Sequence, residues 1–568
     1  MLNKLLFVLA GIVLLCSCNT TEPTDSNNVI MPKGGVRYGG EFRFMSSEKV
    51  DNLFPLSTTD VYSDRVVSQL YEGLLKIDLS TTEIVPAIAA SYEVNENSTS
   101  YTFKLRDDVF FHDDECFENG EGRKVTASDF KYSLEFACSD NKLNELSYLL
   151  KDRVKGAKAY FKGKADDVNG IKVKDKHTLV IELSKPFSVF HKVLAHTGLG
   201  VFPQEAVDQY GDNIGQHAVG TGAFQLEKWT EEKIILKRNN HYWDTDDFEN
   251  KLPFLNKVVM TYSEDKTDEL LSFRAEKIDL VLDIPVEEVQ NILGTLGEAK
   301  ADKNVKHVLD SKSSMSLIYY GFDLESKLFS KKSVRKAFNL AIDREAIIET
   351  WLEGEGRATS HGFVPPMEGY PSEQVKGYSY NIEKAQQLMV KAGYPGGRGL
   401  PTINLYVNAL VESGSHKLAK AIAFSLKQNI GVGINIKLIS IGEREKRIQS
   451  GEAIFWRSGW VADYPDPENF LNMFYGGNEE KNNVNVNPFN YHNADFDALY
   501  KQALEETNEK KRMEMLAKCD QMIIDDAVVM PILTEDFLTM VNLKVKNFKT
   551  NEMEQLDFSK LYIKEINK

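Results

Sequence analysis

Apolar residues recur along most of the chain at the spacings that helices and strands require. Residues 63–73 and 418–426 carry apolar side chains at every third or fourth position, which predicts helices. Apolar and polar side chains alternate over residues 101–106 and 432–438, as is typical of strands with one buried face. Because the second helical segment leads directly into a strand, the pattern predicts an α/β fold.

A short segment in the second half of the chain brings unlike side chains together. The apolar residues 453–456 predict a strand that leads into a loop with Arg457, Trp460 and Asp463. Two prolines follow, and we expect them to exclude a helix and to fix the exit of the loop. A cation, a large ring and an anion on one stiff loop suit a zwitterionic ligand. The alternative is that Asp463 caps a turn and Trp460 packs in a core.

The N-terminus has the features of an export signal. A basic residue precedes an apolar run from Leu5 to Leu15, which is too short to cross a bilayer and predicts a signal peptide over residues 1–17. The residues around Cys18 resemble a lipobox, so Cys18 is predicted to carry the lipid anchor. Residues 18–35 are mostly small and polar and are predicted to form a tether. The predicted location is the extracytoplasmic face of a bacterial membrane.

The composition is that of a large folded body with an acidic surface. Of the 568 residues 42% are apolar, which is enough for large cores, and at about 150 residues per domain the chain should form three or four compact units. The formal net charge is −16 without a long basic block, so nucleic-acid binding is not expected. The chain has no Gly-x-Ser-x-Gly, His-Glu-x-x-His or Walker sequence, so it is not expected to be an enzyme, and no cofactor is expected.

The cysteines and histidines predict no metal site. Cys116 and Cys138 flank a charged insertion and the helix after it, and in an exported chain they are predicted to form a disulfide. Cys519 occupies the apolar face of a predicted helix and is expected to be a buried free thiol. His112 has no partner at ligand spacing, so its predicted role is structural.

Several segments in order along the chain carry a family resemblance; they are residues 70–75, 125–130, 220–224, 334–344 and 459–464. Together they resemble the oligopeptide-binding proteins of bacterial ABC importers, which form solute-binding protein family 5. In that family the aspartate of the last segment receives the α-ammonium of a peptide, and the neighbouring backbone pairs with the peptide.

The resemblance implies a site for a peptide ligand. Asp463 would accept the peptide ammonium, and Gly459, Trp460 and Val461 would supply backbone contacts. Arg457 is a candidate partner of the peptide carboxylate or of Asp463 itself.

The resemblance also implies a two-lobed periplasmic-binding-protein-like fold with a hinge and an extra inserted domain. The expected divisions are lobe I (36–80, 186–307 and 537–568), inserted domain II (81–185) and lobe III (308–536). A monomer would capture the peptide by lobe closure and deliver it to the permease subunits of an ABC transporter. The alternatives are a nickel chelate, haem or another small solute as ligand, or a secreted hydrolase or surface adhesin.

Overall fold

The structure of the protein is a computed structural model that describes residues 32–564, apart from residues 264, 283, 285–306, 353, 355 and 478–485. The predicted signal peptide and Cys18 lie outside the described residues. No helix among those described is both long and apolar enough to cross a bilayer.

A seven-stranded mixed sheet joins segments from both ends of the chain. Its strand order is β12-β19-β11-β1-β10-β9-β8, and β1 pairs in parallel with β10. The strands are β1 (Glu41–Ser46), β8 (Phe224–Trp229), β9 (Lys233–Arg238), β10 (Lys257–Tyr262), β11 (Leu280–Leu282), β12 (His307–Ser313) and β19 (Asp536–Asn542). β12 pairs with β19 along its whole length, so the predicted boundary at residue 308 falls inside a strand of this sheet.

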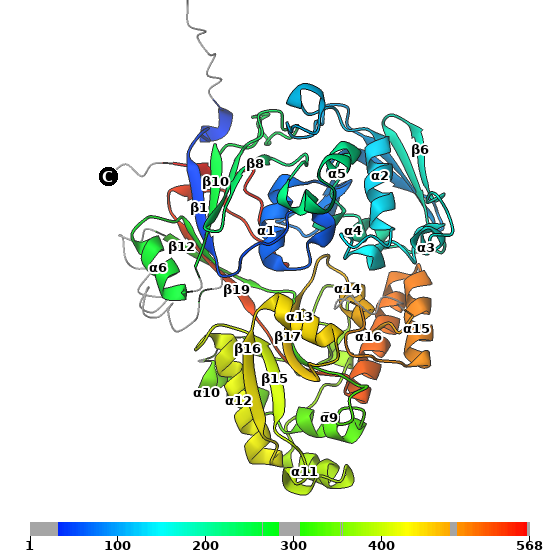
Figure 1. Ribbon diagram of the computed structural model, residues 1–568, viewed down its shortest axis with the longest axis vertical. Coiled ribbons are helices and arrows are strands. Elements are labelled where there is room, and N and C mark those ends of the chain that lie inside the picture. Colours follow the sequence, from blue (N-terminus) through cyan, green and yellow to red (C-terminus); the bar gives the residue numbers. More distant parts are fainter. Residues whose placement is uncertain are drawn as a thin grey trace, which may run out of the picture.

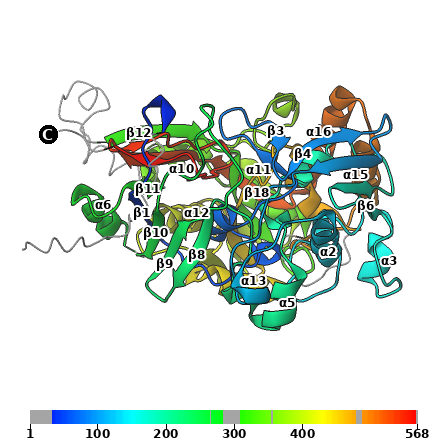
Figure 2. The ribbon, with the colours of Figure 1, turned by 90° about the horizontal axis from the view of Figure 1, so that it is seen from above.

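A smaller antiparallel sheet lies at one end of the molecule. Its order is β4-β5-β7-β6, formed by β4 (Ala89–Val94), β5 (Ser100–Leu105), β6 (Ile171–Asp175) and β7 (Thr178–Glu182). Helix α2 (Ala127–Ala137) packs against β6 and β7. β2 (Leu75–Ile77) and β3 (Ile84–Pro86) form a separate pair. Figure 2 shows β4, β6 and α2 at the opposite end from β1, β10 and β12.

A six-stranded sheet forms the centre of the other lobe. Its order is β14-β18-β13-β17-β15-β16, with β13 (Ser316–Phe322), β14 (Arg357–Ala358), β15 (Ile403–Asn408), β16 (Ile434–Ile439), β17 (Phe455–Val461) and β18 (Val529–Thr534). Side chains alternate between its two faces: Tyr319 and Trp456 belong to one buried cluster, whereas Tyr320 and Phe455 belong to another. Both faces of this sheet are therefore covered.

Figure 1 shows the two lobes one above the other, with α13, β17 and α14 at the level where they meet. The remaining elements are α1 (Val61–Leu70), α3 (Ala157–Phe161), α4 (Phe190–Val193), α5 (Gln204–Tyr210), α6 (Lys266–Arg274), α9 (Lys332–Leu340), α10 (Arg344–Trp351), α11 (Ile382–Lys391), α12 (Gly414–Ile430), α13 (Ile441–Gln449), α14 (Pro467–Leu471), α15 (Ala494–Glu505), α16 (Glu509–Asp526), β20 (Val545–Lys546) and β21 (Tyr562–Ile563). The predicted α/β class is confirmed.

Side chains cap the first turn of several helices, and two arginines lie in unexpected places. Thr126 forms a capping box with its helix, and Asp343 and Asn381 cap α10 and α11. Arg335 and Arg344 would be expected at the surface or beside carboxylates. Both are instead buried and donate to backbone carbonyl oxygens, such as those of residues 527 and 531.

The predicted disulfide is not formed in this structure, because Cys116, Cys138 and Cys519 are all free thiols. Cys116 lies in the loop before α2, whereas Cys138 follows the last residue of that helix. The expectation that Cys519 is buried and unpaired is confirmed.

Candidate functional site

Strand β17 extends further than the sequence pattern indicates. It continues through Val461, so Arg457, Gly459 and Trp460 lie within a strand and not in a loop. β13 pairs with β17 from Phe455 to Val461, but β15 pairs with it only at Trp456. Within the described part of the chain, the second edge of β17 therefore has no partner strand from Arg457 onward.

The segment after β17 turns into a short helix. Asp466 accepts a hydrogen bond from the N–H of Glu468 (3.0 Å), and Pro467 occupies the first turn of α14. The expectation that these prolines exclude a helix is therefore wrong at Pro467. The first turn of a helix tolerates proline, since its N–H would have no helical partner there.

Asp463 lies directly beyond the open edge and is partly exposed. Its Oδ2 accepts a hydrogen bond from the Asn469 side chain (2.9 Å), and its backbone N–H donates to Asn469 Oδ1 (3.1 Å). Trp460 Nε1 donates to the same oxygen (2.9 Å). Asn469 thus fixes both the aspartate and the tryptophan. The sequence pattern gives no indication of this role of Asn469, except that the residue follows a short capped turn.

A histidine from the other lobe faces the same carboxylate. His196 Nε2 lies 3.7 Å from Asp463 Oδ1, and His196 Nδ1 accepts a hydrogen bond from the N–H of Gly198 (2.9 Å). Because Nδ1 is the acceptor, the ring proton is on Nε2, where it points toward Asp463. Among the described residues, 31% of the Asp463 side chain stays exposed, so one side of it is still accessible.

Asp64 of α1 adds a second carboxylate close to this point. Burial raises the pKa of Asp64 to about 6; Thr197 and His196 oppose the increase, while Asp463 and Asp60 add to it. Asp64 and His196 line a cavity of about 480 Å³ in the lobe that contains α1. Asp463 does not line this cavity. The carboxyl groups of Asp64 and Asp463, one from each lobe, therefore lie close together beside this cavity.

Arg457 marks the other end of the open edge. Arg457 is 8% exposed, and its Nε has no hydrogen-bond partner in the part of the chain that the structure describes. Among the described residues, the guanidinium of Arg457 forms no ion pair and no hydrogen bond, so it is not paired with Asp463. The structure brings Arg457 and Asp463 to the same strand and its exit, but it does not pair them.

The described residues show no metal-binding group of His, Cys, Asp and Glu side chains. His112 is buried, and its Nε2 forms a hydrogen bond with the carbonyl oxygen of Gly222 (2.9 Å). Burial lowers the pKa of His112 to about 4, which keeps the ring neutral. Its expected structural role is confirmed.

Residues 83–482 match the middle region of the bacterial extracellular solute-binding proteins, family 5. The chain belongs to this family. The matched range includes β17, Asp463 and α14. The family consists of proteins that bind solutes.

Individual relatives of this solute-binding protein cover most of its length. It is 28% identical to the periplasmic oligopeptide-binding protein OppA of Escherichia coli over 86% of both chains. It is 26% identical to the heme-binding protein A of Haemophilus influenzae over 84% of both chains. The periplasmic binding protein DppA of Helicobacter pylori, solved with the peptide STSA, matches with a TM-score of 0.80 and 24% identity, over 93% of this chain and 99% of that one. These likenesses confirm the two-lobed fold.

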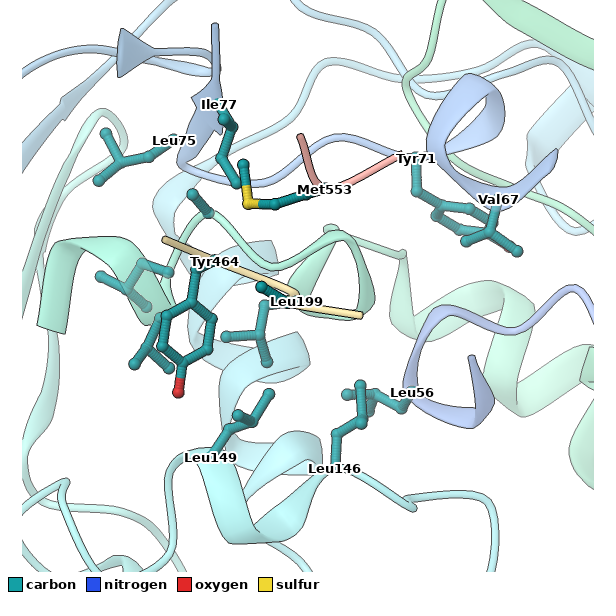
Figure 3. Close-up of a cluster of buried hydrophobic side chains, with 14 of the residues drawn as sticks. Leu56, Val67, Tyr71, Leu75, Ile77, Leu146, Leu149, Leu199, Tyr464 and Met553 are labelled. Carbon is teal, nitrogen blue, oxygen red and sulfur yellow. The ribbon is translucent and has the colours of Figure 1, made fainter. Parts of the chain in front are cut away.

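In this family member, the segment after Asp463 packs against the part of the molecule that contains the four-stranded sheet β4-β5-β7-β6. Tyr464 is buried in the cluster that Figure 3 shows, together with Leu149 and Leu199. Its hydroxyl donates to Glu468 Oε2 (2.5 Å), and Arg153 forms an ion pair with the same carboxylate. The loop after β17 is thus held between segments that are far apart in sequence.

A second buried carboxylate strengthens this anchor. Lys192 of α4 donates to Asp466 Oδ2 (3.2 Å) and to the carbonyl oxygen of Pro465 (2.9 Å). Arg512 of α16 also binds Asp466 through both terminal nitrogens. Burial works against the charge of Asp466, but Arg512 and Lys192 outweigh it and lower the pKa of this carboxyl. The carboxylate is therefore ionised and fully paired.

Proposed function

We propose that this protein is the peptide-binding component of an ABC importer. One observation carries the proposal: an edge of β17 that no described strand pairs with has the carboxylate of Asp463 at one end and the buried guanidinium of Arg457 at the other. A peptide in extended form offers backbone groups for such an edge and opposite charges at its ends. The names of the peptide-binding relatives support the same ligand class.

In this proposal the backbone of Gly459, Trp460 and Val461 pairs with the peptide like an added strand. Main-chain hydrogen bonds provide affinity without reading side chains, so one site accepts many sequences. Asp463 receives the α-ammonium, held in place by Asn469. The peptide carboxylate supplies the partner that Arg457 lacks among the described residues.

Capture proceeds by closure of the two lobes, without chemistry on the ligand. Closure brings His196 and Asp64 from one lobe toward Asp463 in the other, and it removes water from the ammonium site. The closed form, a monomer, is then recognised by the permease subunits. Export and lipid attachment at Cys18 would hold the protein at the outer face of the cytoplasmic membrane or in the periplasm.

The ammonium assignment can be tested with a double-mutant cycle. Asp463→Asn keeps the shape of the side chain but removes its charge, and N-acetylation removes the charge from the peptide. Truncating one partner of a desolvated pair typically costs about 2–5 kcal/mol. Calorimetry of both proteins with free and acetylated tetraalanine should therefore give two losses that are strongly non-additive.

Equal effects of acetylation in the wild type and in Asp463→Asn would place the ammonium elsewhere. Mass spectrometry of material that co-purifies with the protein separates the ligand classes. Short peptides are the expected result, whereas haem or another small solute would replace the peptide proposal.

A further inference from the structure

Three ion pairs join the two lobes. They are Lys192–Asp466 (3.2 Å), Arg153–Glu468 and Lys185–Glu505. In Figure 1, α3 and α4 lie above the level where the lobes meet, and α15 and α16 lie below it. We call these three pairs the interlobe clasp.

The acidic partners belong to the lobe of the six-stranded sheet, and the basic partners belong to the other lobe. α14 follows β17 of that sheet, and α16 leads into β18. Asp520 of α16 accepts hydrogen bonds from the N–H groups of Phe363 (2.7 Å) and Val364 (3.1 Å), which come soon after β14. Arg153 lies over the ring of Phe187 (5.0 Å), which comes soon after β7 of the four-stranded sheet. Each pair of the clasp therefore has one member in each lobe.

The two buried carboxylates of the clasp also have partners in their own lobe. Arg512 of α16 donates to Asp466 Oδ2 (3.0 Å). The hydroxyls of Tyr464 and Tyr500 donate to Glu468 (2.5 and 2.7 Å). If the lobes separate, both carboxylates thus keep donors that move with them. This matters because a buried charge without a partner is costly.

The basic members of the clasp can also lose their partners without being left buried and unpaired. Arg153 donates to the carbonyl oxygen of Leu149 (2.6 Å) within its own lobe. Lys192 is 18% exposed, so water can reach its ammonium once α14 moves away. Lys185 and Glu505 are both largely exposed. The clasp is therefore built as a contact that can break and form again.

The clasp lies close to the candidate ammonium site. Lys192 donates to the carbonyl oxygen of Pro465 (2.9 Å), two positions after Asp463. His196, which comes shortly after the end of α4, lies 3.7 Å from Asp463. One segment thus carries both a cation of the clasp and the ring that covers the aspartate.

We propose that Lys192 and Arg153 are positioning residues for closure, which bind Asp466 and Glu468 only when the lobes are together and so delay the release of the ligand. This inference rests on the proposed function and adds to it a role for the part of the chain around the four-stranded sheet. A contact that exists only in the closed form shifts the equilibrium between the open and closed forms by its whole free energy. Ligand enters through the open form, where the clasp is absent, so association should not depend on it.

The experiment uses protein that has been unfolded, freed of ligand and refolded. Stopped-flow tryptophan fluorescence measures the association and dissociation of tetraalanine, with Trp460 as a reporter beside Asp463. Small-angle X-ray scattering measures the radius of gyration without ligand. The variants are Lys192→Met, Lys192→Gln as a second neutral variant, and Lys192→Arg. Lys155→Met is the matched control, because Lys155 forms an exposed ion pair within one lobe.

Both neutral variants should release tetraalanine at least about tenfold faster than the wild type, with an unchanged or faster association. Their radius of gyration without ligand should exceed that of the wild type. Their preference for free over N-acetylated tetraalanine should be unchanged, because Asn469 still holds Asp463. Lys192→Arg, which keeps the charge, and Lys155→Met should behave like the wild type.

The results separate this inference from the proposed function. If the wild type binds tetraalanine but both neutral variants have its dissociation rate and its radius of gyration, the clasp is refuted and the proposed function stands. If the wild type does not bind tetraalanine, the proposed function fails for this peptide, and the scattering of the unliganded proteins tests the clasp alone. A larger radius of gyration in the neutral variants would then support the clasp, and an equal one would overturn it.

Discussion

Replacing Arg153 by methionine should strongly destabilise the contact between the smaller sheet's domain and α14. The side chain of Glu468 is fully buried and that of Arg153 is 9% exposed, so the variant leaves a buried carboxylate without its cation. Burial works against the charge of Arg153, but Glu468 outweighs it and raises the pKa of the guanidinium. Removing one partner of such a pair costs about 3–5 kcal/mol. The Tyr464 and Tyr500 hydroxyls remain as donors to Glu468, which favours the lower end of that range.

Urea unfolding followed by fluorescence and circular dichroism measures this cost. Arg153 also donates to the carbonyl oxygen of Leu149 and lies over the ring of Phe187, so the single variant loses more than the ion pair. Glu468→Gln and the double variant complete a cycle that isolates the pair. Lys155→Met is the control, because its ion pair with a residue on β7 is exposed and should be worth at most about 1 kcal/mol. Additive losses in the cycle, or a cost for Arg153→Met no larger than that of the control, would refute the reasoning.

Two other predictions concern pH and thiols. Peptide affinity should increase as the pH rises through about 6, because an ammonium bound beside Asp463 favours the ionised form of Asp64 and so releases its proton. Asp64→Asn should flatten this increase, measured by calorimetry between pH 5 and about 8, and an unchanged slope would refute the role of Asp64. In a chain that begins after Cys18, thiol labelling of the denatured, unreduced protein should count three free thiols, and a count of one would restore the predicted disulfide.

Local features were predictable from the sequence, whereas contacts between distant segments were not. The cap at Thr126 depends on residues within one helical turn, so the pattern alone identifies it. The cap at Asp466 was missed because proline was interpreted as a helix breaker, although it fits the first turn. The burial of Arg335 depends on carbonyl groups about 190 positions away, which no local pattern contains.

The candidate site divides in the same way. The charges at Asp463 and Arg457 could be proposed from the segment itself and its family resemblance. Their surroundings could not, because His196 and Asp64 come from the other lobe. The extent of β17 also required the structure, since its strand partner β13 lies more than a hundred residues earlier.

The open edge of β17 also bears on how the protein avoids aggregation. An unpaired strand edge is a template on which other chains can add, and the same hydrogen bonds that would capture a peptide can start a fibril. Here the exposed length is only that from Arg457 to Val461, it begins at a buried cation, and Pro465 follows soon after it. An edge this short can pair with one short peptide. It is too short for a second copy of the chain to add a strand and extend the sheet.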